Sequence, residues 1–334
     1  MGIDYVHTRQ ETSFYSPLED FEETTIAVDV REDPLTGRQT RIVPESFQLA
    51  DDPDIESVVA DAEGCFFCPD TVEEATPKYP DFVGMDRGSV GEATSFPNLN
   101  PYGAHSNVVV LTEDHYVPLA DFDVSTFADG FEAVMEYVTA VFAEEEEATV
   151  ASANMNYLRS AGSSIIHPHV QTLVDDRGTN NQRRRLDAHR NYYDRTGRQF
   201  FTDLLDAERD DERYVGRTGD VTWYAPFAPR HQYHVRGVVD TEGVPASDSD
   251  ALHDLATGLT GVLEYYADLG LNSFNFGFQV ARDEPATRPV IDVVARSVFD
   301  QYYWSDATFF ETVHGESVVD VAPEEYASSV AAFF

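Results

Sequence analysis

Two histidines that flank a proline, His167 and His169, are the side chains of this sequence best suited to chemistry, and Gln171 follows two residues later. Polar and β-branched residues surround them, which predicts an extended strand over residues 165–174. In a strand, residues i and i+2 point to the same face, so both imidazoles and the amide would project together. Such a group can hold a metal ion, a phosphate, or one of each. The alternative is a pair of partly buried, hydrogen-bonded histidines.

The two cysteines, Cys65 and Cys68, form a Cys-x-x-Cys pair. The N-terminus has no apolar signal segment, so we expect a cytoplasmic protein, in which such a pair is a metal site or a redox pair. A redox pair would precede a helix that follows a strand, whereas Pro69 and Asp70 predict a loop, which favours metal. Structural zinc sites use four Cys or His ligands. His115, in a predicted turn, and one histidine of the pair could complete such a site.

The histidine that zinc does not take would remain free beside the metal on the same strand face. Next to hydrogen-bond donors for an anion, a free imidazole can act as a nucleophile on phosphorus. Gln171, Asn156 and the backbone N–H groups around Gly162 could supply those donors without adding charge. The residues therefore allow phosphoryl chemistry at this strand.

A strand–helix–strand–strand pattern occurs twice along the chain. The first copy consists of the strand 107–111, the helix 124–144 and the strands 151–158 and 165–174; the second consists of the strand 232–239, the helix 248–267 and the strands 273–280 and 290–295. Asn156 corresponds to Asn275, but the second copy has Arg288-Pro289-Val290 in place of His-Pro-His. We expect an α+β fold of two histidine-triad-like halves, 1–178 and 179–334, each an antiparallel sheet with a packed helix. The chemistry belongs to the first half.

The remaining segments carry weaker signals. Residues 1–60 are predicted to be loosely structured apart from a short strand over 40–43, and a helix is predicted near 183–205. The tail is predicted to form a strand over 308–313 and a helix that begins around Pro323.

The chain is extremely acidic, with 61 acidic residues against 22 basic ones and a net charge of −39. Lys78 is the single lysine, and the acidic residues are spread along the whole chain. Such a coat suits a cytoplasm of concentrated salt, because screening removes the self-repulsion. It argues against a broad nucleic-acid surface. No run of 18 apolar residues exists, so we expect no transmembrane helix.

Taken together, these pieces resemble the galactose-1-phosphate uridylyltransferase family, the transferase branch of the histidine-triad superfamily. Its motifs are matched, in order and spacing, by Asp33-Pro34-Leu35-Thr36-Gly37, Cys65-Phe66-Phe67-Cys68, Phe96-Pro97-Asn98, Asp114-His115, Asn156 with Gly162 and Ser164, and His167-Pro168-His169-Val170-Gln171. Gln171 stands where ordinary triad hydrolases carry a third histidine, which places the resemblance in the transferase branch.

The resemblance implies that His169 attacks the α-phosphorus of a UDP-sugar and releases the sugar 1-phosphate. A second sugar 1-phosphate would then take the uridylyl group, in ping-pong kinetics. Gln171 would hold a phosphoryl oxygen, and His167 would join Cys65, Cys68 and His115 on one structural zinc ion. The other implied contacts are phosphate positioning by Asn156, Gly162 and Ser164, ribose binding by Asn98, aromatic surroundings of uracil from Phe66, Phe67 and Phe96, and sugar-hydroxyl binding by Glu311. The resemblance also suggests a homodimer.

The sequence departs from the family at two places. Val43-Pro44-Glu45-Ser46 occurs where many members have an arginine, so a phosphate or sugar contact is missing. Some members have a second metal site, but here Arg183-Arg184-Arg185 and the surroundings of Arg288 replace its glutamate and histidines, so we expect none. His231 and His234 are interpreted as structural histidines.

Three other functions remain open from the sequence. One is a nucleoside-diphosphate-sugar phosphorylase or adenylyltransferase that uses the same histidine with another nucleotide or acceptor. Another is a zinc-stabilised protein that binds nucleotides without turnover. A metal hydrolase is disfavoured, because it would require an open position on the zinc ion.

We predict that this protein unfolds when salt is removed. Dialysis from concentrated potassium chloride into low salt exposes the acidic residues to their mutual repulsion, so the circular dichroism signal of the fold should be lost. Full retention of the signal in low salt would contradict salt adaptation.

Overall fold

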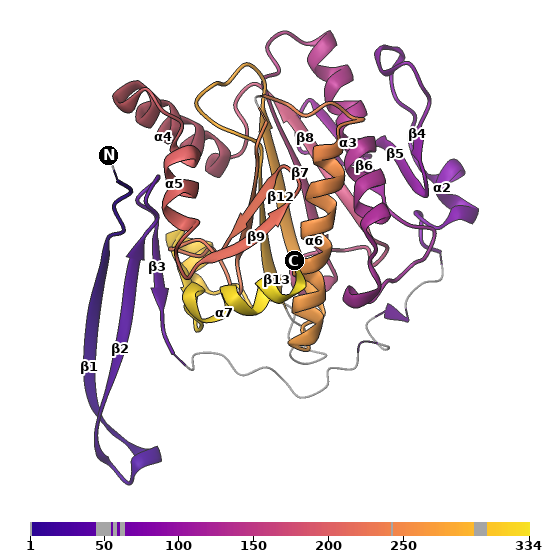
Figure 1. The fold of residues 1–334 in the computed structure, drawn as a ribbon. Coiled ribbons are helices and arrows are strands. Elements are labelled where there is room, and N and C mark those ends of the chain that lie inside the picture. Colours follow the sequence, from indigo (N-terminus) through magenta and orange to yellow (C-terminus); the bar gives the residue numbers. More distant parts are fainter. Residues whose placement is uncertain (1, 45–54, 56–58, 61–63, 242, 297–305) are drawn as a thin grey trace.

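One continuous sheet organises the part of the chain that this computed structural model describes, residues 2–44, 55, 59–60, 64–241, 243–296 and 306–334. The sheet has ten strands in the order β4-β5-β6-β8-β7-β12-β13-β11-β10-β9 (Figure 1). Their bounds are β4 Gly88–Val90, β5 Ala93–Pro97, β6 His105–Val110, β7 Val150–Tyr157, β8 His169–Asp175, β9 Tyr214–Thr218, β10 Val221–Tyr224, β11 Val235–Val239, β12 Ser273–Ala281 and β13 Val290–Arg296.

The two repeats meet at the middle of this sheet. The antiparallel pair β7–β12 joins them, with Asn156 opposite Asn275 and Asn154 opposite Gly277. On one side of this pair the chain forms β6, helix α3 (Val124–Glu144), β7 and β8; on the other it forms β11, helix α6 (Asp250–Asp268), β12 and β13. The predicted α+β fold with a duplicated unit is confirmed, although the two halves share one sheet. The boundary at residue 178 stays a prediction.

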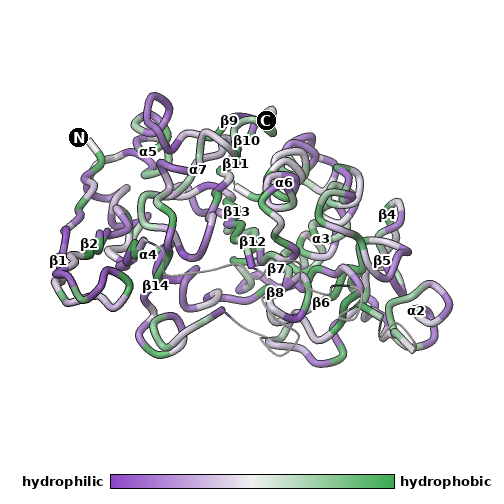
Figure 2. Tube along the Cα trace, turned by 90° about the horizontal axis from the view of Figure 1, so that it is seen from below, coloured by the Kyte–Doolittle hydropathy of each residue, from purple (hydrophilic) through white to green (hydrophobic). Residues whose placement is uncertain are grey.

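Helices α3 and α6 lie side by side on one face of the sheet (Figures 1 and 2). Asp123 caps α3 by accepting a hydrogen bond from Thr126 N at 2.8 Å. The apolar stripe of α3 then faces the sheet, where the Phe131 ring lies 5.8 Å from Phe276 and 5.7 Å from Phe278. None of the helices in the described ranges is both long and apolar enough to cross a membrane.

The opposite face of the second half is covered by helices α4 (Asn180–Thr196) and α5 (Phe200–Glu208) (Figure 2). Val238 and Val290 contact the apolar side of α5, whereas their neighbours Val239 and Ile291 belong to the core beneath α6. The single helix expected near 183–205 is wrong, because Gly197 (φ 70°) ends α4 in the left-handed conformation that glycine tolerates.

The sequence suggested a loosely structured N-terminal segment, but the described part of it forms strands. Strands β1 (His7–Ser16) and β2 (Glu22–Glu32) form a long antiparallel hairpin that extends away from the body (Figure 1). β2 also pairs with β3 (Gln39–Ile42), which lies parallel to β14 (Ser317–Val319). Most side chains of the hairpin are exposed, so it has no hydrophobic periodicity that a sequence pattern could reveal.

The C-terminal prediction was half right. Helix α7 spans Pro323–Val330, as expected, but residues 310–314 form a π-helical turn, η5 (Phe310–His314), and not a strand. Glu311 accepts hydrogen bonds from the backbone N and the hydroxyl of Thr308, both at 2.8 Å, and these local bonds favour a helical turn. The other short elements are α2 Pro69–Ala75, η1 Pro17–Glu19, η2 Asp81–Val83, η3 Leu119–Asp121, η4 Arg159–Ala161 and η6 Ala331–Phe333.

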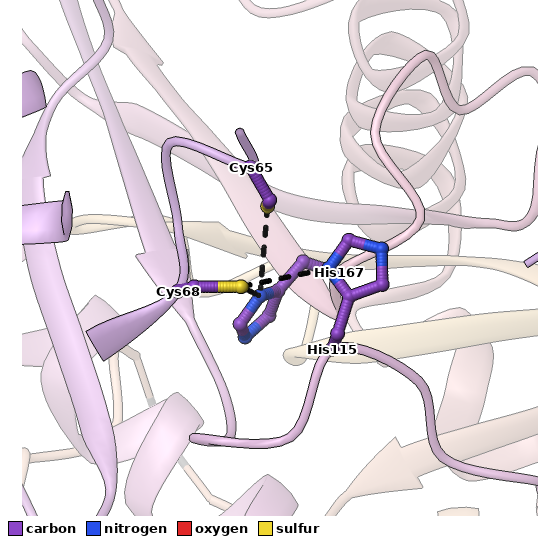
Figure 3. Close-up of side chains that lie close together, drawn as sticks. All are labelled: Cys65, Cys68, His115 and His167. Atoms are coloured by element: carbon purple, nitrogen blue, oxygen red, sulfur yellow. Dashed lines mark hydrogen bonds between the residues drawn. The ribbon is translucent and has the colours of Figure 1, made fainter. Parts of the chain in front are cut away.

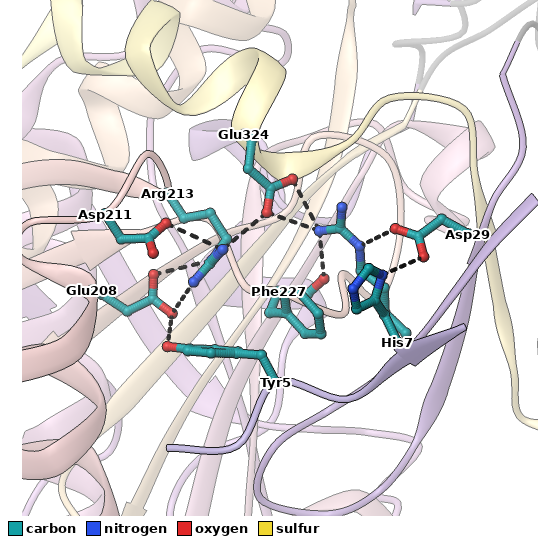
Figure 4. Close-up of polar contacts among 9 residues, drawn as sticks. Tyr5, His7, Asp29, Glu208, Asp211, Arg213, Phe227 and Glu324 are labelled. Atoms are coloured by element: carbon teal, nitrogen blue, oxygen red, sulfur yellow. Dashed lines mark hydrogen bonds and ion pairs between the residues drawn. The ribbon is translucent and has the colours of Figure 1, made fainter. Parts of the chain in front are cut away.

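A buried ion-pair network fastens the N-terminal segment to the second half (Figure 4). Glu324, at the start of α7, accepts from Arg31 Nη1 at 2.9 Å and from Arg213 Nη1 at 3.0 Å. Arg213 also pairs with Glu208 at 3.1 Å, and Tyr5 donates its hydroxyl to Glu208 at 2.5 Å. The network thus ties β2, α5, α7 and the N-terminus together.

Glu324→Gln should destabilise the fold. The substitution removes the charge that two largely buried guanidinium groups share, which should lower the free energy of unfolding by about 1–3 kcal/mol. The neighbouring Glu325 is exposed, so Glu325→Gln is the matched control and should change stability by less than about 0.5 kcal/mol. Urea unfolding at constant salt measures both, and equal midpoints for the two variants would refute a role for the network.

Candidate active site

Two thiols and two imidazoles converge just before the start of β8 (Figure 3). The ligand atoms of Cys65, Cys68, His115 and His167 all lie within 4.8 Å of one another. The Nδ1 atom of His167 is 3.8 Å from Cys65 Sγ and 3.7 Å from Cys68 Sγ, and His115 Nδ1 is 3.7 Å from Cys68 Sγ. Sulfur and nitrogen ligands of a tetrahedral zinc ion stand about 3.6 Å apart. The four side chains that the sequence suggested are therefore placed to bind a metal ion.

The cysteines are presented by a turn that leads into α2. Cys68 is the N-cap of α2, and the Thr71 hydroxyl donates to the carbonyls of Cys65 at 2.6 Å and Cys68 at 3.1 Å. The prediction of a loop at Pro69 is wrong, because Pro69 is the first residue of α2. Proline suits this position, since the N–H group that it lacks would have no partner within the helix. Burial and the neighbouring Cys65 raise the pKa of Cys68 to about 11, so a bound cation would be needed to keep both thiolates.

His167 is buried, and its orientation is fixed from the far side of the ring. Its Nε2–H donates to the Thr112 carbonyl at 2.7 Å, which leaves the Nδ1 lone pair directed at the cysteines. The strand expected from residue 165 begins only at His169, so His167 lies in the bend before β8. Ser163 donates its hydroxyl to the Ile165 carbonyl at 2.6 Å, a local bond that competes with strand pairing.

His169 is the first residue of β8 and is only 8% exposed. Its Nδ1 lies 2.8 Å from the His167 carbonyl, and a carbonyl can only accept, so Nδ1 carries the proton. Burial lowers the pKa of His169, although the hydrogen bond to His167 opposes this effect. The imidazole is therefore neutral, and Nε2 keeps its lone pair. The Phe67 ring packs against it at 5.2 Å.

The polar residues expected around His169 lie on the same sheet face or on the loop that leads to it. Gln171 is half-buried, two residues along β8, and pairs with Asn154 of β7. Asn156 is exposed near the end of β7, and Gly162 and Ser164 are exposed on the loop that follows η4. Gly162 has φ 94°, which an L side chain rarely adopts, so the loop turns there.

Two residues of the second half that the sequence analysis did not assign support Asn156. Asn275 Nδ2 donates to Asn156 Oδ1 at 2.7 Å and to the Ala161 carbonyl at 2.9 Å. Arg296 Nη1 in turn donates to Asn275 Oδ1 at 2.7 Å. The side-chain oxygen of Asn156, Oδ1, thus already accepts a hydrogen bond, and the side-chain Nδ2 is the group that could donate to a ligand. The alignment of the two sequence repeats placed Asn156 at the position of Asn275. This correspondence was the sequence signal for the contact, because the two equivalent strands pair with each other.

The residues expected at the nucleoside end differ in exposure. Asn98 Oδ1 accepts from Asn100 N at 3.0 Å, as in an ordinary turn, but its buried Nδ2 has no partner within the described segments. Phe96 is 2% exposed and packs against Phe67 at 5.6 Å, whereas Phe66 is 62% exposed. Asn98 is therefore the residue of this group with a free buried donor.

At the sugar end, Glu311 is already engaged. Besides Thr308, its carboxylate accepts from Val318 N at 3.2 Å. These bonds lower the pKa of Glu311, although burial opposes them, so the group is ionised. His231 Nδ1 donates to the Ala295 carbonyl at 3.1 Å, and its Nε2 lies 3.6 Å from Asp306 Oδ1. Glu45 and Ser46, where the family arginine was missing, lie outside the described residues.

Comparison with known proteins gives one sequence relative and several similar structures. A protein of Archaeoglobus fulgidus, described as uncharacterized, is 34% identical over 304 residues, 91% of each chain. An ADP-glucose phosphorylase from Arabidopsis thaliana, solved with bound ADP-glucose, has TM-score 0.70 at 18% identity and covers 91% of this chain and 98% of its own. No protein-family model matches the sequence.

Two further structures share the architecture. A GalT-like protein from Arabidopsis thaliana has TM-score 0.68 at 19% identity, covering 90% of this chain and 97% of its own. A uridylyltransferase has TM-score 0.64 at 20% identity, covering 91% and 98%. The TM-scores establish a common fold, and at identities this low they establish the fold alone.

Replacing one of the four clustered ligands should abolish metal binding. Cys68→Ser leaves three ligands, so the metal content should fall from about one ion per chain to near zero after dialysis against a chelator. Elemental analysis measures the content, and thermal unfolding should occur at a lower temperature in the variant. His253→Gln, on an exposed position of α6, is the control. A Cys68→Ser protein that keeps its metal would rule out this site.

Proposed function

We propose that this chain, which belongs to one family with the Archaeoglobus fulgidus protein and has the fold of the galactose-1-phosphate uridylyltransferases, is a nucleotidyltransferase that acts on nucleotide sugars. The observation that carries the proposal is the neutral imidazole of His169. Its Nδ1–H is held by the His167 carbonyl, so Nε2 is the free nucleophile. A buried, oriented and uncharged imidazole is what covalent catalysis on phosphorus requires.

In the first half-reaction, His169 Nε2 attacks the α-phosphorus of a nucleoside-diphosphate sugar. The N–P bond forms while the bond from the α-phosphorus to the bridging oxygen breaks, and the sugar 1-phosphate leaves with the electron pair. In the second, a phosphate oxygen of the acceptor attacks the same phosphorus, and His169 departs as a neutral imidazole. The donor product leaves before the acceptor reacts, which predicts ping-pong kinetics.

The polar groups beside His169 would stabilise the charge on the phosphoryl oxygens. The amides of Gln171 and Asn156 and the hydroxyl of Ser164 would be the neutral donors on that side of the sheet. The backbone N–H groups of Gly162 and Ser163 already donate to the carbonyls of Arg159 and Leu158. Amide and hydroxyl groups do not titrate near neutral pH, so these donors exchange no proton with the His169 imidazole. An amide at Gln171 also cannot activate water as an imidazole would, which favours transfer over hydrolysis.

Zinc fits the metal site, because two thiolates and two imidazoles are its preferred structural ligands. Cys65, Cys68, His115 and His167 would hold it, and four protein ligands leave no position for substrate. The ion would supply rigidity and no chemistry at phosphorus. Fixing His167 fixes the carbonyl that orients His169.

The ends of the substrate are assigned to the remaining residues. Asn98 would bind the ribose through its unpartnered Nδ2, and Phe66, Phe67 and Phe96 would surround the base. Glu311 would accept a sugar hydroxyl in addition to its present bonds. We infer a homodimer from the resemblance, and size-exclusion chromatography tests it.

The specific reaction that we propose is exchange of UMP between UDP-glucose and galactose 1-phosphate. The second candidate is phosphorolysis of a nucleoside-diphosphate sugar, with inorganic phosphate as acceptor. It is favoured by the fold similarity to the ADP-glucose phosphorylase and by the missing arginine at Val43-Pro44-Glu45-Ser46. Both candidates share the nucleotidyl-histidine and differ in base and acceptor.

Trapping the covalent intermediate tests the proposal. The protein is incubated in high salt with UDP-glucose or ADP-glucose labelled at the α-phosphate, without acceptor. We expect acid-labile label on the wild type and a loss of at least about a thousand-fold in His169→Asn, since the nucleophile is removed. His105→Asn, outside this group, is the control and should label normally.

Two outcomes decide between the functions. Label that persists in His169→Asn would refute the nucleophile, and binding of nucleotide sugar without label on the wild type would indicate a binding protein. Chasing the label with galactose 1-phosphate or with inorganic phosphate then identifies the acceptor.

A further inference from the structure

The second half carries a buried group of charged side chains at the position equivalent to Gln171. Gln171 pairs with Asn154 across β8 and β7, and Asn154 pairs with Gly277 across β7 and β12. Gly277 in turn pairs with Asp292 on β13. Residues directly opposite in a sheet share a face, and each step between strands is about 4.8 Å. Asp292 therefore lies on the face of Gln171, roughly 14 Å away.

Both carboxylate oxygens of Asp292 accept hydrogen bonds from this group. Oδ1 accepts from Arg236 Nε at 2.6 Å and from His234 Nε2 at 2.9 Å, and Oδ2 accepts from Arg185 Nη2 at 2.5 Å. The Arg230 backbone N–H donates to His234 Nδ1 at 3.1 Å, which fixes the neutral tautomer of this histidine. Burial lowers the pKa of His234 to about 4, so it adds no charge.

The group has more positive than negative charge. Four guanidinium groups, those of Arg38, Arg185, Arg230 and Arg236, interact electrostatically with two carboxylates, Asp33 and Asp292. His189 is also neutral, because burial and the nearby arginines lower its pKa to about 3. Two positive charges are thus left over, inside a protein whose net charge is −39.

Several donors of this group have no partner. Arg185 is 5% exposed, yet among the described residues its Nη1 has no hydrogen-bond partner, and neither ring nitrogen of the fully buried His189 has one there. The Arg230 guanidinium makes no hydrogen bond or ion pair with any residue that the structure describes. Burial and the neighbouring arginines lower the pKa of Arg230 to about 9. Unpartnered buried donors beside surplus positive charge are the features of an anion site.

We propose that Arg185, Arg230 and Arg236 form a second phosphoryl-binding site, in the half of the sheet that has Arg288-Pro289-Val290 in place of His-Pro-His. Arg38 adds positive charge, but its Nη atoms already donate to Ser317 Oγ and to the Ala228 carbonyl. Guanidinium forks match the geometry of phosphate oxygens, and two surplus charges match a phosphate dianion. Asp292, at the centre of the group, lies roughly 14 Å from Gln171 across the sheet. Reacting atoms must approach to about 3–3.5 Å. The phosphoryl group bound here is therefore not the one that His169 attacks, and the site is a binding site distinct from the nucleotidyl-transfer centre.

Calorimetric titration with inorganic phosphate at constant potassium chloride tests the site. Arg230→Gln should weaken the binding at least about ten-fold, and Arg230→Lys, which keeps the charge, should retain most of it. Gln171→Ala should leave this binding unchanged. The matched control is Arg282→Gln, because the Arg282 guanidinium is already bonded to the carbonyls of Phe142 and Glu146. Urea unfolding verifies that each variant is folded.

Three results would overturn the proposal: equal phosphate affinity in Arg230→Gln and the wild type, loss of binding in Gln171→Ala instead, or equally tight binding of chloride. A parallel titration with galactose 1-phosphate distinguishes the sources of the phosphoryl group. Competition between the sugar phosphate and inorganic phosphate would support a phosphorylated sugar as occupant, and binding of inorganic phosphate alone would support the free ion. Covalent labelling at His169 in Arg230→Gln is measured separately, so failure of this site and failure of the proposed function are distinguishable.

Discussion

The hydrogen bond from His169 Nδ1 to the His167 carbonyl, 2.8 Å long, is the contact on which the rest of the site depends. One residue serves two purposes here: the side chain of His167 is one of the four that could hold a metal ion, and its backbone carbonyl holds the neighbouring imidazole. Proline between them removes a backbone donor and restricts the chain, so the bend is rigid. The cysteine turn, the Thr112 carbonyl and the start of β8 all act by keeping this one carbonyl in place.

The fold explains why a duplicated unit is needed for a centre that occurs in one half. β7 is an inner strand only because β12 pairs with it, and Asn156 is oriented by Asn275 across that pair. Arg296, at the end of β13, extends the same support. The second half therefore orients Asn156 of the first half. At its own position equivalent to Gln171 it has Asp292, which is bonded to Arg236 and Arg185.

The sequence predicted the parts whose information is local and missed those whose information is distant. The apolar periodicity of 124–144 matched α3 in both bounds, and the metal cluster followed from residue types that few other sites use. The strand start at His169 was missed because local hydrogen bonds override β-propensity before it. His167 donates to the Thr112 carbonyl, and Ser163 donates to the Ile165 carbonyl. The β1–β2 hairpin was missed because its side chains are exposed and show no pattern. The arginine group could not be foreseen, since Arg38, Arg185 and the pair Arg230 and Arg236 come from three segments that meet only in the folded chain.

The near absence of lysine has a practical consequence. Lys78 follows α2 closely, its side chain is 60% exposed, and it pairs with Asp86 at 2.5 Å. Apart from the terminal amine, a reagent that acylates amines has this one target in the whole chain. A fluorophore attached there would sit next to the helix that Cys68 caps. The acidic composition thus makes the chain suitable for single-site conjugation, with the label just beyond the C-terminal end of α2.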